Sequence, residues 1–220
     1  MDKDFDNFLD ELKLLYDPQI LNSQQSQLFK SVEPEFKNEF LKKYFNNIKY
    51  GKPETQTEEL FNIIRNFIEL KERNSHVISQ LKIGKYAIDR AIIDESGIIG
   101  IELKPLHKIQ KNKRIITNLD DILNEDRTQE QLRHYLFHPK MRFLILTNLY
   151  DVFIFTKWNI NKDKITSHLR FNFIDFFKEY LKYNRFKDLL IKYFRDYPIW
   201  DLDKHFFKDL DEYWKSIDSI

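Results

Sequence analysis

The chain has 220 residues, of which 42% are hydrophobic and 32% charged, enough apolar residues for one domain with a buried core. Its 36 Lys and Arg residues nearly balance 35 Asp and Glu residues, so total charge identifies no partner. The absence of Cys excludes disulfides, Cys-based zinc sites and thiol nucleophiles, and the four glycines form no nucleotide-binding loop motif.

Three segments follow one another along the chain. Residues 1–51 have aromatic and apolar residues at helical spacing and are predicted to form an N-terminal helical segment. Residues 52–157 mix helix and strand patterns, starting with a helix that begins near Thr57. Residues 158–220 return to a helical pattern that opens near Phe171, and they are interpreted as a C-terminal helical segment or connector.

The middle segment contains the strands. The apolar patterns predict five strands and a second helix, at residues 77–83, 86–93, 98–104, 142–147 and 152–156 for the strands and 118–138 for the helix. The turn sequence at residues 94–97 joins the second and third strands as a hairpin. This order predicts an α/β fold with a central mixed β-sheet flanked by helices.

The predicted hairpin brings two acids together. Centring its turn between residues 95 and 96 pairs Ala91 with Gly100 and Asp89 with Glu102, and it puts Lys104 on the same face. Carboxylates directly opposite on a hairpin lie about 4.5–5.5 Å apart at Cβ and repel, which a divalent cation such as Mg²⁺ would offset. The small residues are expected to leave room for a metal and a bulky substrate. A solvated face with ordinary charges is the competing interpretation, and a three-residue loop would make the acids diagonal neighbours.

These residues also form a familiar pattern. Asp89 followed by Glu102-Leu103-Lys104 resembles the PD-(D/E)XK nuclease superfamily, in which an acid on one strand precedes E-x-K on the next. Gln131 and Tyr135 resemble the Q-x-x-x-Y element of many members, and residues 142–155 resemble a strand pair of restriction-enzyme nuclease domains. The likeness covers residues 52–157 and is closest to the N-terminal nuclease domains of type IIG restriction-modification enzymes. Ile88 stands where many members have Pro.

The resemblance implies a restriction-endonuclease-like core and Mg²⁺-dependent hydrolysis of phosphodiester bonds in double-stranded DNA. It assigns the metal ligands to two acids, a backbone carbonyl and an acid on the first helix, which are Asp89, Glu102, Leu103 and Glu54, with Glu58 as the alternative to Glu54. Lys104 would position the attacking water or stabilise the phosphorane-like charge. Gln131 would orient Lys104 or touch the phosphate, and Tyr135 would support packing.

Basic residues follow the E-x-K motif. Residues 76–118 carry eight Lys or Arg residues and four acids, although the chain as a whole is nearly neutral. Residues 104–114 contain no acid, and their candidate DNA contacts are Lys108, Lys111, Lys113 and Arg114. A solvated basic loop is the alternative interpretation.

The resemblance also suggests a biological setting. Its relatives continue into an adenine methyltransferase and a target-recognition domain, so such domains are expected partners, and a transient homodimer would cut both strands. Two alternatives remain: a DNA-binding module of nuclease fold that is inactive without those domains, and a repair or transposition nuclease. No apolar run approaches the length of a membrane span, and the acidic first residues are unlike a signal peptide, so a cytoplasmic protein without membrane contact is expected.

Overall fold

The computed structural model describes residues 3–18, 36–50, 54–72, 74–95, 97–157, 164–165, 169–183 and 185–196. The helices are α1 (Lys3–Leu12), the 3₁₀ helix η1 (Lys13–Tyr16), α3 (Glu39–Tyr50), α4 (Glu54–Lys71), α5 (Leu119–Leu123), α6 (Asp126–Leu136), α7 (Phe173–Lys182) and α8 (Phe186–Asp196). The strands are β1 (His76–Ile83), β2 (Tyr86–Asp94), β3 (Gly97–Leu103), β4 (His107–Gln110), β5 (Lys113–Ile116), β6 (Met141–Thr147), β7 (Asp151–Phe155) and β8 (Leu169–Asn172).

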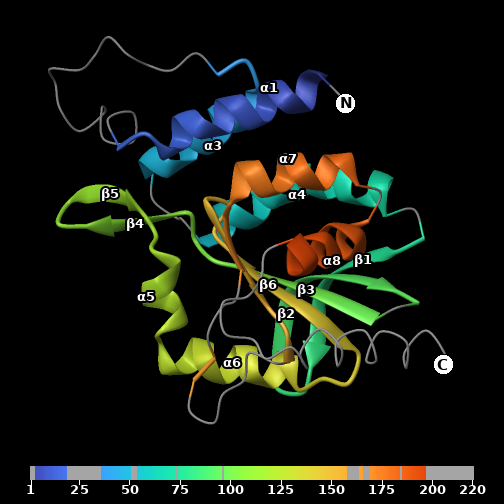
Figure 1. Cartoon of the computed structure of the whole chain (residues 1–220). Helices are drawn as coiled ribbons and strands as arrows, with labels where there is room; N and C mark the ends of the chain where they lie inside the picture. Colours follow the sequence, from blue (N-terminus) through green and yellow to red (C-terminus); the bar gives the residue numbers. More distant parts are fainter. Residues whose placement is uncertain are drawn as a thin grey trace, which may run out of the picture.

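Six of these strands form one mixed sheet in the order β1-β2-β3-β6-β7-β8 (Figure 1). The β3–β6 pair is parallel, and the other neighbouring pairs are antiparallel. The connection from β3 to β6 contains α6, as a parallel crossover requires. The prediction of an α/β fold with a mixed sheet flanked by helices is confirmed.

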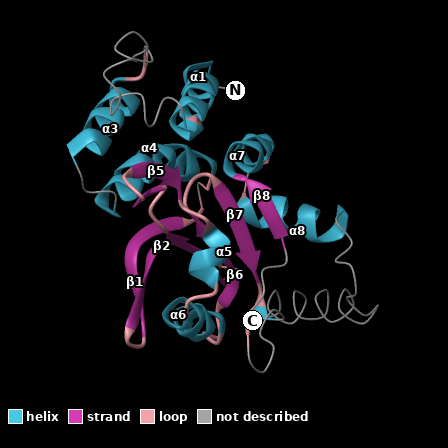
Figure 2. Cartoon of the chain, turned by 90° about the vertical axis from the view of Figure 1, so that its left-hand side faces the viewer, coloured by secondary structure: helices cyan, strands magenta, loops and turns pink. Residues whose placement is uncertain are grey.

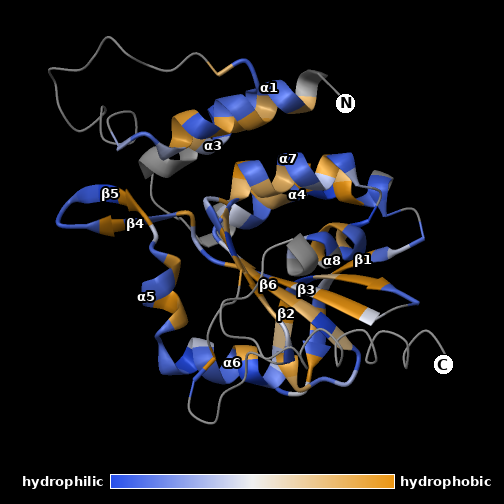
Figure 3. Cartoon of the chain, in the orientation of Figure 1, coloured by the Kyte–Doolittle hydropathy of each residue, from blue (hydrophilic) through white to orange (hydrophobic). Residues whose placement is uncertain are grey.

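Helices cover both faces of the sheet. Figures 1 and 2 show α4 and α7 on one face, with α1 and α3 outside them, and α6 on the other face. The ring centroid of Phe5 in α1 lies 3.8 Å from that of Phe67 in α4 and 5.5 Å from that of Phe177 in α7. The described helices of the predicted N-terminal segment therefore pack into the same hydrophobic core as the sheet. Hydrophobic and hydrophilic residues alternate along the ribbons of α1 and α3 (Figure 3).

The β2–β3 hairpin has the predicted register. Its ladder pairs Ile93 with Ile98, Ala91 with Gly100, and Arg90 with Ile101, which confirms the centring of the turn. The ladder between these two strands ends at Arg90 and Ile101. Asp89 and Glu102 therefore lie just beyond the last ladder pair, where the two strands separate.

Strict alternation fails near Asp89. It predicts that Ile88 shares a face with Arg90 and Ile92, but Ile88 belongs to the buried cluster on the α6 side, together with Ala91. Gln80, on the neighbouring strand β1, has a left-handed backbone with φ of 57°. This conformation is uncommon for a non-glycine residue and interrupts the regular alternation of the β1–β2 ribbon.

The small residues of the hairpin serve core packing, which corrects the expectation that they leave room for a substrate. Ala91 is fully buried, and a Cβ atom at Gly100 would lie 2.9 Å from Leu144 Cδ1 and 3.0 Å from Ile88 Cδ1. Any larger side chain at position 100 would force the α6-side core to move.

Other boundaries also differ from the prediction. The helix predicted over 118–138 is two helices, α5 and α6, because Glu125 between them takes an extended backbone. Residues 169–172 form strand β8, and the helix that follows begins at Phe173 because the Asn172 side chain accepts a hydrogen bond from the Ile174 N–H. The sheet therefore continues past residue 157. The predicted apolar stripe at residues 202–217 lies outside the described residues.

Candidate active site

The site is built around the end of β3, where Glu102 is buried with only 4% of its surface exposed. Its Oε1 accepts hydrogen bonds from Lys104 Nζ at 3.0 Å and from Gln131 Nε2 at 2.9 Å. Its Oε2 is also buried, and among the described residues it has no hydrogen-bond partner. A buried carboxylate oxygen without a partner is costly, so this atom is a candidate ligand position.

Burial controls the charge of Glu102. It raises the pKa of this carboxyl to about 7, and the nearby Asp89 carboxylate acts in the same direction. Lys104 and Gln131 oppose the rise by interacting with the ionised form. The carboxyl is therefore poised to change protonation near neutral pH, and a further positive charge beside it would favour ionisation.

Asp89 comes to the same place from β2. Its Oδ2 accepts a hydrogen bond from the Leu103 N–H at 2.8 Å, and its Oδ1 accepts one from Gln80 Nε2 at 3.4 Å. Burial raises the pKa of Asp89, and the nearby Glu58 carboxylate adds to this, whereas the Leu103 bond and the Lys104 charge lower it. The structure thus brings Asp89, Glu102 and Lys104 together, as the hairpin register predicted.

Helix α6 supports the site through two side chains at i and i+4. Gln131 Nε2 donates to Glu102 Oε1 and also to Tyr135 Oη, the latter at 2.8 Å. The Tyr135 hydroxyl in turn donates to the Ala87 carbonyl at 2.7 Å, and the ring is fully buried. Gln131 therefore touches the acid directly, and Tyr135 ties α6 to the start of β2.

Arg90 is a further polar residue of the site, which the sequence analysis did not assign. Its side chain is buried, donates to the Asp89 carbonyl at 2.7 Å and to Asn62 Oδ1 at 3.1 Å, and lies 3.9 Å from Glu58 Oε2. Asn62 and Glu58 lie one turn apart on α4. Their i, i+4 spacing puts both side chains on one face of the helix, but the spacing alone does not indicate the buried cation that this face meets.

Of the two candidate acids on the first helix of the nuclease core, only Glu58 has a described side chain. Glu54 is the first residue of α4, and its side chain lies outside the described residues. Glu58, one turn further along, affects the pKa of Asp89 and lies close to Arg90. The structure therefore places Glu58 beside the site, and the prediction for Glu54 falls on a side chain outside the described residues.

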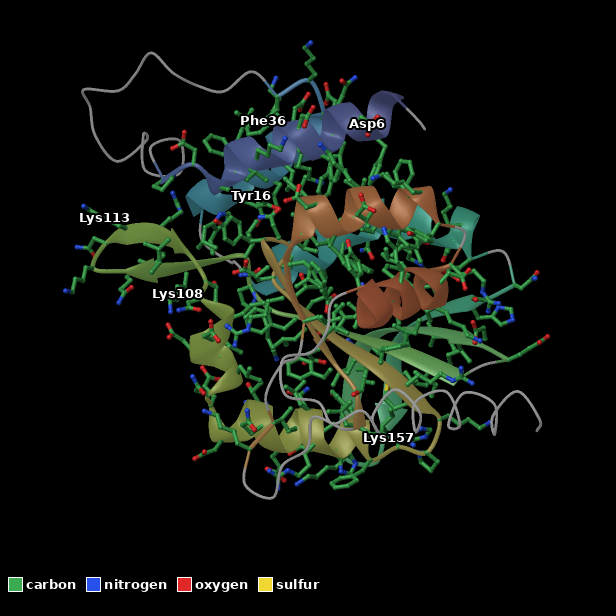
Figure 4. All side chains as sticks on the ribbon, in the orientation of Figure 1. Asp6, Tyr16, Phe36, Lys108, Lys113 and Lys157 are labelled. Atoms are coloured by element: carbon green, nitrogen blue, oxygen red, sulfur yellow. The ribbon has the colours of Figure 1, made fainter. Side chains whose placement is uncertain are left out.

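The basic residues predicted to contact DNA after the E-x-K motif differ in their exposure and in their partners. Lys108 Nζ lies 3.4 Å from Asp121 Oδ2 of α5, and Arg114 is partly buried, which lowers its pKa. Lys111 and Lys113 are exposed at the turn of the β4–β5 hairpin, and Figure 4 shows Lys113 there. His107, in the same segment, is buried, and its burial lowers its pKa to about 4.

The donor atoms fit a small hard cation. Asp89, Glu102 and the Leu103 carbonyl supply oxygen ligands of the kind that Mg²⁺ takes, together with waters. The unpartnered buried Oε2 of Glu102 would gain a partner when such an ion binds. Among the described residues, no group of three or more His, Cys, Asp or Glu side chains is arranged to hold a metal. The candidate set is therefore limited to two carboxylates, with the Leu103 carbonyl as the third oxygen that the resemblance implies.

Comparison of the chain with family models, with curated proteins and with solved structures finds no match. In the described part of the chain, no helix is both long and apolar enough to cross a membrane.

Proposed function

We propose that the chain is a Mg²⁺-dependent endonuclease of the PD-(D/E)XK kind that hydrolyses double-stranded DNA, as the nuclease module of a restriction-modification enzyme. One observation carries the proposal. Two carboxylates, the buried Glu102 and the partly buried Asp89, lie beside the Lys104 ammonium, and one Glu102 oxygen has no partner among the described residues. Groups with perturbed pKa values and incomplete hydrogen bonding are typical of functional sites.

The element order supports a restriction-endonuclease-like core. Helix α4 precedes three antiparallel strands, and after α6 the chain returns as β6 parallel to β3. Asp89 lies on the second of these strands, E-x-K ends the third, and Gln131 lies on the following helix. This is the order in which the family resemblance places the same residue types.

Asp89, Glu102 and the Leu103 carbonyl would hold Mg²⁺, with Glu58 nearby as a further acid. When bound, the ion would polarise the phosphate and lower the pKa of a coordinated water. The residues of the chain have separate tasks. Lys104 is fixed by Glu102 and can donate to the charge that develops on the phosphoryl oxygens, and Gln131 fixes the orientation of Glu102.

Plasmid cleavage by the full chain tests this function. Cleavage is expected with Mg²⁺ and not with EDTA, and both Asp89→Ala and Lys104→Ala are expected to abolish it. Glu59→Ala is the control, because Glu59 is exposed on α4, next to Glu58 but outside the site. Cleavage that survives Asp89→Ala would disprove the site assignment. Binding of DNA by a folded chain that never cuts it would instead support the inactive binding module.

A further inference from the structure

The β4–β5 hairpin is separate from the main sheet and projects from the body of the molecule (Figure 1). Its two strands pair from His107 and Ile116 at the base to Gln110 and Lys113 at the end. The two turn residues, Lys111 and Asn112, both have left-handed backbones, with φ of 49° and 60°. This is the tight two-residue turn that matches the twist of paired strands, so the ribbon is narrow up to its end.

The base of the hairpin is fixed by buried hydrogen bonds. Leu106 N–H donates to Thr57 Oγ1 of α4 at 3.0 Å, and Thr117 N–H donates to the Leu106 carbonyl at 2.9 Å. The His107 ring lies between the Leu15 carbonyl, 3.1 Å from Nε2, and the Tyr44 hydroxyl, 3.4 Å from Nδ1. A ribbon held at its base presents its far end with little loss of entropy on binding.

The far end is basic and carries an exposed apolar side chain. Lys111 and Lys113 are exposed, and Figure 3 shows the turn region as hydrophilic. Ile109 lies in the middle of this charged sequence, and its apolar side chain is 63% exposed to solvent. Residues 104–119 contain no acid, so nothing within the segment itself neutralises the lysines. The two lysines at the end of the hairpin can bind a polyanion, and Ile109 can contact an apolar surface on the same partner.

We propose that the β4–β5 hairpin enters the major groove of B-form DNA beside the phosphate that is cut. The major groove, about 12 Å wide, admits a two-stranded β-ribbon. Lys111 and Lys113 would contact phosphates on the groove edges, and Ile109 would contact base edges such as thymine methyl groups. The inference rests on the proposed function, because that function puts the scissile phosphate at Lys104.

Chain length sets how far from the cut this contact lies. Lys111 follows Lys104 by seven residues, which span at most about 24 Å when extended. At about 3.4 Å per base pair, this is roughly seven base pairs, less than one helical turn. The hairpin and the candidate active site can therefore contact the same duplex.

Equilibrium binding to a DNA duplex of about 20 base pairs tests the inference, with the full chain carrying Asp89→Asn to prevent cutting. Lys111→Ala with Lys113→Ala is expected to weaken binding about tenfold or more and to reduce the salt slope by about two. Ile109→Ser is expected to weaken binding about fivefold with an unchanged salt slope, because the contact is apolar.

Matched controls exist elsewhere on the surface. Lys140→Ala with Lys157→Ala removes the same charge away from the hairpin. Figure 4 shows Lys157 on the opposite side of the molecule from Lys113, and Lys157 Nζ lies 3.2 Å from the carbonyl of Pro139, the neighbour of Lys140. Ile78→Ser changes another exposed isoleucine, on β1. Both are expected to bind as the parent does. Hairpin variants that bind no more weakly than these controls would overturn the inference.

The duplex type separates groove entry from plain charge attraction. The A-form major groove is too narrow and deep for a ribbon, so an RNA duplex of the same sequence is expected to bind weakly and without dependence on Ile109. Equal hairpin-dependent binding of RNA and DNA duplexes would overturn groove entry. Hairpin-dependent DNA binding by a chain that never cuts DNA would disprove the proposed hydrolysis and support the hairpin inference. Cleavage that requires Asp89, together with DNA binding that does not depend on the hairpin, would support the proposed hydrolysis and overturn the hairpin inference.

Discussion

Two positions along β2 each lie in a group of two acids and one cation, Asp89 near the middle of the strand and Asp94 at its end. The Glu102 cluster consists of Asp89, Glu102 and Lys104, and what we call the Glu72 cluster consists of Glu72, Asp94 and Arg185. The residue types are nearly the same, but the hydrogen bonding differs. In the Glu72 cluster both carboxylate oxygens of Glu72 have partners, whereas in the Glu102 cluster one buried oxygen has none among the described residues.

The partners of Glu72 explain what that cluster does. Glu72 accepts a hydrogen bond from the Phe186 N–H at the start of α8 and one from Ser75 Oγ, and Arg185 also pairs with Asp94. Burial raises the pKa of Glu72, but the Phe186 bond, Arg185 and Ser75 all oppose the rise. These contacts attach α8 to the ends of α4 and β2. A satisfied cluster of this kind stabilises the fold, and an unsatisfied one is suited to bind a ligand.

Asn substitutions at the two aspartates of β2 make the sharpest test of this difference. Asp89→Asn is expected to lower the cleavage rate at least about 10³-fold, equivalent to about 4 kcal/mol, because it would remove a charge from the proposed Mg²⁺ site. The unfolding free energy is expected to change by less than about 1 kcal/mol, since the Asn oxygen can still accept from Leu103. Asp94→Asn, the same chemical change, is expected to keep the cleavage rate and lower stability. A loss of cleavage in Asp94→Asn with a loss of stability in Asp89→Asn would disprove the assignment of catalysis to the Glu102 cluster and of stability to the Glu72 cluster.

Glu72→Ala is expected to destabilise the fold by about 3 kcal/mol, because it leaves the buried Phe186 N–H without an acceptor and Arg185 with one acid fewer. Chemical denaturation measures this change. Glu69→Ala, which removes an exposed carboxylate from the last turn of α4, three residues before Glu72, is the control and is expected to cost about 0.5 kcal/mol or less. Cleavage per folded molecule is expected to be unchanged by both variants, and a large loss in Glu72→Ala would contradict the structural assignment.

Glu102→Gln is expected to stabilise the metal-free protein at high pH. Because burial raises the pKa of Glu102 to about 7, the folded state binds more protons than the unfolded state between about pH 4.5 and 7, and stability falls as pH rises through that window. The variant lacks this fall, so we expect a gain of about 2 kcal/mol at pH 8 and little at pH 4.5. Denaturation in EDTA at both pH values measures it. Glu59→Gln is the exposed control, and a gain independent of pH would argue against the raised pKa of Glu102 as its cause.

Tyr135→Phe is expected to have the smallest effect. It removes the hydroxyl that donates to the Ala87 carbonyl and accepts from Gln131, at a cost of about 1 kcal/mol in unfolding free energy. The cleavage rate is expected to fall severalfold, since Gln131 then loses one of its two fixed partners. Tyr180→Phe is the matched change beside the Glu72 cluster, where the hydroxyl donates to the Ile68 carbonyl. Tyr180→Phe is expected to lower stability and leave the cleavage rate unchanged. If both variants lose the same cleavage rate, Tyr135 acts only through folding.

The features that depend on neighbouring residues were predictable from the sequence. The β2–β3 register followed from a short turn and period-two alternation, and it correctly brought Asp89, Glu102 and Lys104 together. Sequence periodicity also predicted most of the main sheet, because those strands are long or strongly apolar.

Features that depend on distant residues were not predictable in this way. Strand β8 has four residues and forms by pairing with β7, which ends 14 residues before β8 begins, and its sequence alone predicts the start of the following helix. The burial of Arg90 depends on Glu58 and Asn62, which lie about 30 residues earlier. The hydrogen bond from Leu103 to Asp89 forms where the ladder ends, and no alternation rule predicts where strands separate.

The left-handed backbone at Gln80 has a consequence for protein design. Gln80 lies opposite Asp89, and around this point Ile88 moves to the α6-side core. A regular hairpin given the same Asp, Glu and Lys at the same spacing would keep strict alternation, and its aspartate would sit on an evenly pleated ribbon. Transplanting the site into another scaffold therefore requires copying the irregular residue on the neighbouring strand, and Gly is the substitution there that keeps the conformation at low cost.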